Sequence, residues 1–255
     1  MSFISATVIT RNEAHNIERC LNSLIGIADE IIVVDSLSTD GTQDICRRYG
    51  CLVTERAFTG YGSQRQYAAG LANGQYVLSI DADEVLSDGL RQKIVELKQK
   101  GLTHRMYRFR VVNYICGRPM QRSGMKPDYQ IRLFDRRYAN WDLLDVGERL
   151  SYPSGVQPVT VEGDIRHYRC SHFDELDFKE LRNAEMRGRV LAAAGISAPA
   201  PMRWLRAASA FLRCQLSEGA IFDGEAGLRI SRARYMATLA AYRTAHRIVK
   251  GESEP

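Results

Sequence analysis

The sequence lacks long apolar runs and paired cysteine motifs. Its apolar stretches fall far short of the roughly 20 residues that a membrane-spanning helix needs, and residues 3–10 have neither the charged lead nor the cleavage site of a secretory signal. The six cysteines include no Cys-x-x-Cys pair, so neither a zinc ribbon nor a redox motif is indicated. No recognised nucleic-acid-binding motif is present. We therefore expect a cytoplasmic protein with free thiols that does not bind nucleic acid.

The chain has 255 residues, of which 45% are hydrophobic, and this suffices for a sizeable core. Its net charge of +5 is unevenly distributed, because eleven Arg or Lys face three acidic residues between Arg187 and Lys250. This asymmetry indicates an anionic partner. Within that region, the segment from Met202 to Phe222 carries an apolar stripe with arginines beside it. Such a segment is either an amphipathic helix packed on a sheet or a helix at an anionic membrane surface.

Short β-branched runs alternate with amphipathic segments in the first part of the chain. The pattern predicts strands at 3–10, 30–35, 51–57 and 76–80, and helices at 14–25, 42–49 and 63–71. This alternation indicates an α/β fold with a doubly wound sheet. Strands with alternating polarity at 106–115, 130–134 and 159–169 predict that the second half of the sheet is mixed. From Phe173 onward the pattern is helical, with a break near 198–201.

Three polar clusters follow the predicted strands directly. They are Thr10-Arg11-Asn12-Glu13, the run from Asp35 to Gly41, and Asp81-Ala82-Asp83-Glu84. Ligands of doubly wound sheets bind outside the carboxyl ends of the strands. Two carboxylates with one residue between them can share Mg²⁺ or Mn²⁺ and leave positions for diphosphate oxygens. In isolation, Asp81 and Asp83 are more simply explained as caps of a following helix or as turn residues.

The order of these clusters resembles the family 2 glycosyltransferases with the GT-A fold. The resemblance covers residues 3–90, and its most specific part is Asp35-Ser36-Leu37-Ser38-Thr39-Asp40-Gly41-Thr42. Further segments are similar to the lipopolysaccharide-core glucosyltransferase branch. They are Gly60–Ala68, Asp128 with Arg132-Leu133-Phe134, His167-Tyr168, and Phe222-Asp223-Gly224-Glu225-Ala226-Gly227.

The resemblance implies an inverting transfer of a hexose, commonly glucose, from a UDP-sugar to an inner-core acceptor. It implies a GT-A catalytic domain over residues 1–172, with a nucleotide-sugar half at 1–100 and an acceptor half at 101–172. A helical region at 173–255 would face the acceptor or the membrane. The expected partners are the UDP-sugar and a lipid-linked saccharide, and the expected location is the inner face of the cytoplasmic membrane. The alternatives are another polysaccharide or lipid-carrier acceptor, or a non-catalytic protein that binds nucleotide sugars.

The resemblance also implies roles for individual residues. Thr10, Asn12 and Glu13 would line the nucleoside pocket, although Glu13 is equally well explained as a helix cap. Asp35 would contact the base or ribose, whereas Ser38 and Thr39 are more simply explained as caps of the next helix. Gln64 and Arg65 would close over the diphosphate, for which a guanidinium is suited.

The metal and the base complete the expected site. Mn²⁺ or Mg²⁺ would lie on Asp83 with support from Asp81, and His167 is a further candidate ligand. An inverting transfer needs a base for the acceptor hydroxyl. Related enzymes carry Val-His-Glu after the Arg-Leu-Phe strand, and this chain has Val146-Gly147-Glu148 there. We therefore assign Glu148 as the base, with Asp142 and Asp145 as reserve candidates. Because Gly147 replaces the histidine of the related enzymes, the acceptor of this chain can differ from theirs.

Overall fold

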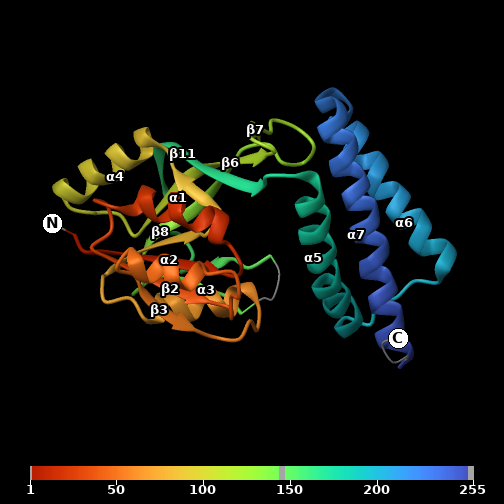
Figure 1. Cartoon of the computed structure of the whole chain (residues 1–255), viewed down its shortest axis with the longest axis horizontal. Helices are drawn as coiled ribbons and strands as arrows, with labels where there is room; N and C mark the ends of the chain where they lie inside the picture. Colours follow the sequence, from red (N-terminus) through yellow and green to blue (C-terminus); the bar gives the residue numbers. More distant parts are fainter. Residues whose placement is uncertain (1, 144–146, 252–255) are drawn as a thin grey trace. The chain divides into compact units, whose positions relative to one another are not determined.

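The computed structural model describes residues 2–143 and 147–251. The chain forms two compact units (Figure 1). Unit 1 comprises Met1–Val112 and Asp128–His167, and unit 2 comprises Asn113–Pro127 and Tyr168–Pro255. The reserve base candidate Asp145 lies outside the described residues.

Unit 1 is built on a mixed sheet in the strand order β3-β2-β1-β4-β8-β6-β11-β5. The strands are β1 (Ile4–Thr10), β2 (Glu30–Asp35), β3 (Leu52–Glu55), β4 (Tyr76–Asp81), β5 (Glu84–Leu86), β6 (Met106–Ile115), β8 (Asp128–Asp135) and β11 (Val159–Cys170). The strands β1 to β4 pair in parallel, whereas β8 is antiparallel to both β4 and β6. This arrangement confirms the predicted α/β fold with a mixed second half.

Helices cover both faces of this sheet. They are α1 (Ala14–Leu24), α2 (Thr42–Arg48), α3 (Tyr61–Gly70) and α4 (Asp88–Lys100). One core joins Ile17 and Leu21 of α1 and Leu90 of α4 to Val8 and Leu78 of the strands. A second core joins the end of α3 to the opposite face through Ala69, Val77 and Phe134. Both faces of β1 and β4 are buried, which accounts for their mainly β-branched and apolar residues, as in other parallel strands.

The parallel register fixes which strand ends meet. Thr10 pairs with Asp35, and Ile9 pairs with Asp81. The three polar clusters of the sequence therefore lie at one edge of the sheet, as predicted. The strand at 51–57 is shorter than expected, and the helix at 63–71 begins two residues earlier, at Tyr61. Gly60 precedes it with φ of +133°, a conformation that L side chains rarely adopt.

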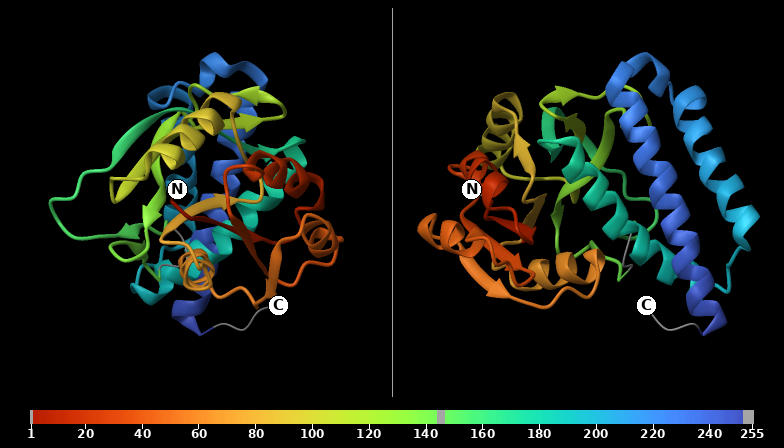
Figure 2. Two further views of the ribbon diagram at one scale, coloured as in Figure 1. Left: turned by 90° about the vertical axis from the view of Figure 1, so that its left-hand side faces the viewer. Right: turned by 45° about the vertical axis from the view of Figure 1, so that its right-hand side comes forward.

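Unit 2 is mainly helical, with α5 (Phe173–Ala193) and α6 (Ala200–Leu212) both packed against α7 (Gly224–Lys250) (Figure 2). The strand β7 (Arg118–Pro119) pairs with the end of β6. The segment Met202–Phe222 is not one helix, because a π-helical turn (Arg213–Ser217) and a 3-10 turn (Ala220–Asp223) follow α6. No helix within the described ranges is long and apolar enough to cross a membrane.

The sequence Phe222-Asp223-Gly224-Glu225-Ala226-Gly227 spans the end of the 3-10 turn and the start of α7. Asp223 accepts a hydrogen bond from the buried Ser123 hydroxyl, which connects α7 to the segment 113–127. A Cβ on Gly227 would overlap the carbonyl oxygen of Ala220. The motif therefore closes the helical hairpin of α6 and α7 and anchors 113–127 within unit 2.

Candidate active site

The loops after β1 and β2 are connected by Asn12. Its amide N–H donates to Ser38 Oγ at 2.8 Å, and its side-chain Oδ1 accepts from the Thr39 N–H at 2.8 Å. Asn12 has φ of +54°, a left-handed conformation that asparagine tolerates better than most residues. Asn12, which we expect to line the nucleoside pocket, thus holds the loops after β1 and β2 together.

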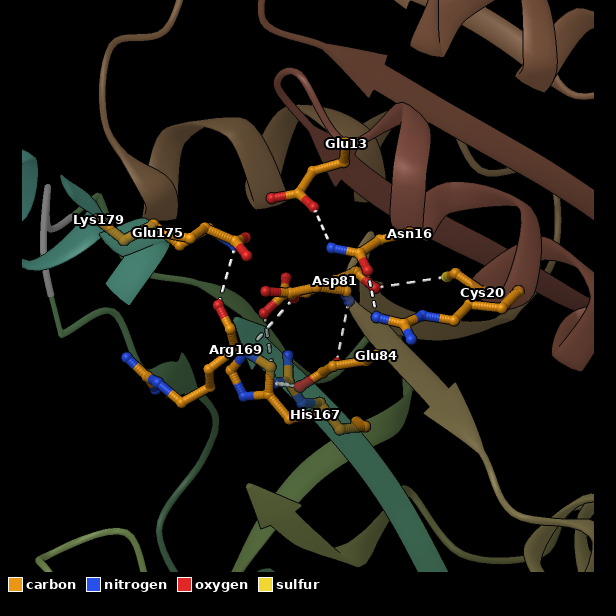
Figure 3. A network of polar contacts seen from close by, with 12 residues as sticks. Glu13, Asn16, Cys20, Asp81, Glu84, His167, Arg169, Glu175 and Lys179 are labelled. Carbon is orange, nitrogen blue, oxygen red and sulfur yellow. Dashed lines mark hydrogen bonds and ion pairs between the residues drawn. The ribbon is translucent and has the colours of Figure 1, made fainter. Parts of the chain in front are cut away.

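The helix-capping explanations of Glu13, Ser38 and Thr39 are wrong in detail. Glu13 occupies the N-cap position of α1, but its carboxylate makes no cap. It instead accepts a hydrogen bond from Asn16 Nδ2 at 2.5 Å (Figure 3). The N-cap of α2 is Gly41, whereas Ser38 donates its hydroxyl to Asp35 Oδ2 at 2.5 Å. These side chains serve the loops at the strand ends.

Asp35 and Gln64 are both fully buried. Asp35 Oδ1 accepts hydrogen bonds from the Ser38 N–H at 2.8 Å and from Gln43 Nε2 at 2.7 Å. Gln64 donates to Ser36 Oγ at 2.9 Å. Thr10 Oγ1, at the end of the neighbouring strand, is buried with no hydrogen-bond partner among the described residues. Buried hydroxyls without a hydrogen bond are rare, and a bound ligand or water would supply the missing partner here.

Arg65 brings two further candidates together. Its Nη2 lies 2.6 Å from Asp81 Oδ1, and its Nε donates to Glu148 Oε1 at 3.0 Å. The guanidinium carbon lies 4.9 Å from the centre of the Trp141 ring, within the range of a cation–π contact. The Arg65 side chain is 5% exposed. A single buried cation therefore connects the end of β4 with the predicted base.

Asp81 is held by two arginines, since Arg132 Nη2 lies 3.7 Å from its Oδ2. Burial alone would raise the pKa of Asp81, but the charges of Arg65 and Arg132 outweigh it and lower that pKa below its ordinary value. Asp81 is thus an ionised carboxylate at neutral pH whose oxygens already face cations. It neither caps a helix nor precedes one, because β5 follows the turn at Ala82-Asp83.

Glu84 and Arg132 are site residues that the sequence did not assign. Glu84 is fully buried, accepts from Arg132 Nη2 at 2.6 Å and accepts from the Asp81 N–H at 3.0 Å (Figure 3). Burial raises the pKa of Glu84, although Arg132 opposes the shift. A third acid directly after Asp81 and Asp83 was the available signal, because a buried carboxylate requires a cation or a hydrogen-bond donor.

His167 reaches Asp83 through strand pairing. The register of β5 and β11 places Glu84 opposite His167 (Figure 3). His167 Nε2 lies 3.3 Å from Asp83 Oδ1. Both side chains are mostly buried. A carboxylate oxygen and an imidazole nitrogen suit Mn²⁺, so the donors present fit a divalent metal. No cluster of three or more His, Cys, Asp or Glu able to hold a metal occurs in the described part of the chain. A metal here would take its remaining ligands from phosphate oxygens and water.

Of the reserve bases, Asp142 is described. It lies on the loop between β9 (Asn140–Trp141) and β10 (Leu150–Ser151), where its Oδ1 accepts from the Arg149 N–H at 3.1 Å. Its backbone N–H donates to the Arg149 carbonyl at 2.9 Å. Asp142 therefore serves the hairpin that carries Glu148, whereas Glu148 is the one that contacts Arg65.

Comparison with known proteins is consistent with these observations. The family model described as glycosyl transferase family 2 matches residues 5–153. An uncharacterized glycosyltransferase of Rickettsia bellii is 36% identical over 140 residues, which is 54% of this chain and 48% of that protein. The chain thus spans about half the length of the Rickettsia relatives that it matches.

Two further proteins share more of the chain. The lipopolysaccharide core biosynthesis glycosyltransferase LpsC of Rhizobium meliloti is 28% identical over 191 residues, covering 72% of this chain and 70% of LpsC. The structure of the mannosyltransferase PcManGT from Pyrobaculum calidifontis, solved with GDP-Man and Mn²⁺, has a TM-score of 0.49 and 20% identity. That comparison covers 98% of this chain and 87% of the other.

Proposed function

The chain belongs to glycosyl transferase family 2, and we propose that it moves a hexose from a UDP-sugar to a lipopolysaccharide-core acceptor with inversion at the anomeric carbon. The observation that carries this proposal is the contact of Arg65 with both Asp81 and Glu148. Arg65 fixes the carboxylate proposed as base at the same strand end as the carboxylates proposed to handle the leaving group. A non-catalytic protein that binds nucleotide sugars would not require Glu148 in this place.

The proposed reaction is a single displacement. The acceptor oxygen attacks the anomeric carbon as the bond from that carbon to the diphosphate oxygen breaks, and Glu148 takes the hydroxyl proton. Oε1 of Glu148 is occupied by Arg65, and no described residue hydrogen bonds to Oε2, so we assign Oε2 as the proton acceptor. A divalent metal held by Asp83 and His167 would neutralise the charge that develops on the departing nucleoside diphosphate. Asp81 positions Arg65 and does not need to bind the metal directly.

Two observations support a lipid-linked acceptor. LpsC, whose name states lipopolysaccharide core biosynthesis, is similar over most of this chain. In unit 2, the apolar stripe of α6 carries three large side chains that are at least half exposed, Trp204, Leu205 and Leu212. Exposed arginines lie on the same helix and just after it, so this face suits the surface of an anionic bilayer. Another polysaccharide or lipid-carrier acceptor remains the second candidate, because Gly147 stands where related enzymes have His.

The experiment that tests the function is a donor screen on the purified protein. Release of UDP from UDP-glucose and other UDP-hexoses is measured with and without Mn²⁺. We expect slow hydrolysis of one donor that depends on the metal, and its acceleration by a lipopolysaccharide-core acceptor. Binding of UDP without turnover of any donor would show a nucleotide-sugar-binding protein instead.

A further inference from the structure

Unit 2 contains a cavity of about 320 Å³ that the proposed catalytic steps do not use. Its lining residues are Asn113, Gly124, Met125, Arg169, Glu180, Arg187, Ala210, Arg213, Arg234 and Thr238. All of them belong to unit 2. Four arginines from β11, α5, the turn after α6, and α7 therefore face one cavity that is also lined by a single carboxylate.

The carboxylates near the cavity leave most of its guanidinium donors unused. Glu180, which is almost buried, lies 3.7 Å from Arg169 Nη2 and 3.9 Å from Arg187 Nη1. Glu218 forms a close pair with Arg234 and lies 3.9 Å from Arg213 Nε. Separations of 3.7–3.9 Å exceed hydrogen-bond length. Four cations thus share two anions, and neither the Arg187 nor the Arg213 guanidinium donates a hydrogen bond to any described residue.

The cavity is held open by the packing of the segment 113–127. Gly124 has φ of +63°, and a Cβ there would collide with Glu218 and Arg234. Arg234 also donates to the Ser123 carbonyl oxygen at 2.9 Å. Asn113 Nδ2 donates to the Met125 carbonyl oxygen at 3.1 Å. The loop and Arg234 are therefore fixed before any ligand arrives, which reduces the cost of ordering the site upon binding.

We propose that this cavity binds the phosphoryl group of a phosphomonoester. A phosphate presents several acceptor oxygens and up to two negative charges, and guanidinium groups match it in charge and in geometry. The volume lies at the lower end of the range for small-molecule sites, roughly 300–1,000 Å³, which suits a sugar phosphate. None of the described lining residues is aromatic, so the cavity offers no surface on which a nucleobase would stack. The assignment of this cavity as a subsite for a phosphorylated acceptor rests on the proposed function. The binding of phosphate itself does not depend on that function.

The chain offers a matched pair of variants on one helix. Arg187 lines the cavity, whereas Arg189 is exposed, lies two residues further along α5 and is not part of the lining. Binding of inorganic phosphate and of glucose 6-phosphate to the full chain is measured by calorimetry, at an ionic strength held constant with chloride. We expect saturable binding by the wild type, weakened roughly tenfold in Arg187→Gln and unchanged in Arg189→Gln.

Arg213→Gln provides a second variant, since this side chain is 69% exposed and its loss does not leave a buried group unpaired. It too is expected to weaken phosphate binding. Vesicles of phosphatidylcholine with phosphatidic acid identify the carrier. If the wild type binds these vesicles but not glucose 6-phosphate, and Arg187→Gln loses vesicle binding, the phosphate belongs to a lipid headgroup. If the wild type binds glucose 6-phosphate but not the vesicles, and Arg187→Gln loses that binding, the phosphate belongs to a saccharide.

The proposal is overturned if the wild type binds neither phosphate ester nor inorganic phosphate saturably, or if Arg187→Gln and Arg189→Gln weaken binding equally. Release of UDP from a donor is measured on the same wild-type preparation. If the wild type binds phosphate through Arg187 but turns over no donor, the phosphate site is supported and the proposed function is refuted. If it turns over a donor but does not bind phosphate through Arg187, the proposed function is supported and the phosphate site is refuted.

Discussion

Arg65 Nη2 lies 2.6 Å from Asp81 Oδ1 and donates a hydrogen bond to Asp81 Oδ2 at 2.8 Å. The first carboxylate of the Asp81-Ala82-Asp83 motif is thus bound to a cation of the chain itself, whereas the second faces His167. The two aspartates, which are alike in sequence, have different tasks in the structure. Their substitutions are expected to have different effects.

Asp83→Asn is expected to raise the Mn²⁺ concentration needed for UDP release by roughly tenfold, because it removes a charged ligand. Asp81→Asn is expected to lower the free energy of unfolding by about 2 kcal/mol, because it removes a charged acceptor from buried Arg65. Metal titration of UDP release and urea unfolding measure the two effects. Asp88→Asn is the control, since that side chain is 93% exposed. If Asp81→Asn changed only the metal requirement, Asp81 would be a metal ligand.

Glu148→Gln is expected to reduce transfer by about 10² to 10⁴, the usual contribution of a general base. The amide retains an oxygen for Arg65 but cannot take the acceptor proton. Affinity for UDP, measured by calorimetry, is expected to stay within about twofold. Asp142→Asn tests the reserve candidate on the same hairpin and is expected to retain transfer. Loss of UDP binding in Glu148→Gln would show that Glu148 only supports Arg65.

The pKa of Asp81 gives a prediction for acid unfolding. Its folded-state pKa lies below the ordinary value of 3.8 because of Arg65 and Arg132, despite burial. The unfolded chain then binds more protons than the folded chain as pH falls through this window. The stabilising contribution of Asp81 is fully present above the ordinary value and is lost as pH falls through the folded-state pKa. The difference in unfolding free energy between wild type and Asp81→Asn should therefore shrink from pH 6 to pH 3. A constant difference would contradict the lowered pKa.

The edge of the sheet that carries the site could be predicted because it depends on local pattern. Thr10, Asp35 and Asp81 each end a β-branched or apolar run, and parallel strands place their carboxyl ends together. Hydrophobic periodicity and composition therefore sufficed to predict that these residues lie close together. The resemblance added Glu148, and the structure connects it to Asp81 through Arg65.

The contacts that complete the site depend on pairings between distant segments. Arg132 reaches Glu84 from β8, and His167 reaches Asp83 only because β5 pairs with β11. The strand β5 has three residues, too few to show an alternating pattern. The arginine cavity likewise combines side chains from separate parts of unit 2. Tertiary packing decides all of these contacts, so the local pattern of a single sequence does not predict which residues meet.

The exposed face of α6 and of the π-helical turn that follows it gives a last prediction, on membrane binding. Leu212 and Leu216 are 55% and 68% exposed, and Arg213 lies between them in sequence. The double variant Leu212→Ser with Leu216→Ser is expected to weaken binding to vesicles containing anionic phospholipid at least tenfold, because two apolar side chains no longer enter the interface. Sedimentation with vesicles measures this. Leu52→Ser, which alters an equally exposed leucine of unit 1, should bind as the wild type does. If the wild type bound neutral vesicles as tightly as anionic ones, the arginines would have no role in binding. If the double variant bound anionic vesicles as tightly as the wild type, this face would have no role.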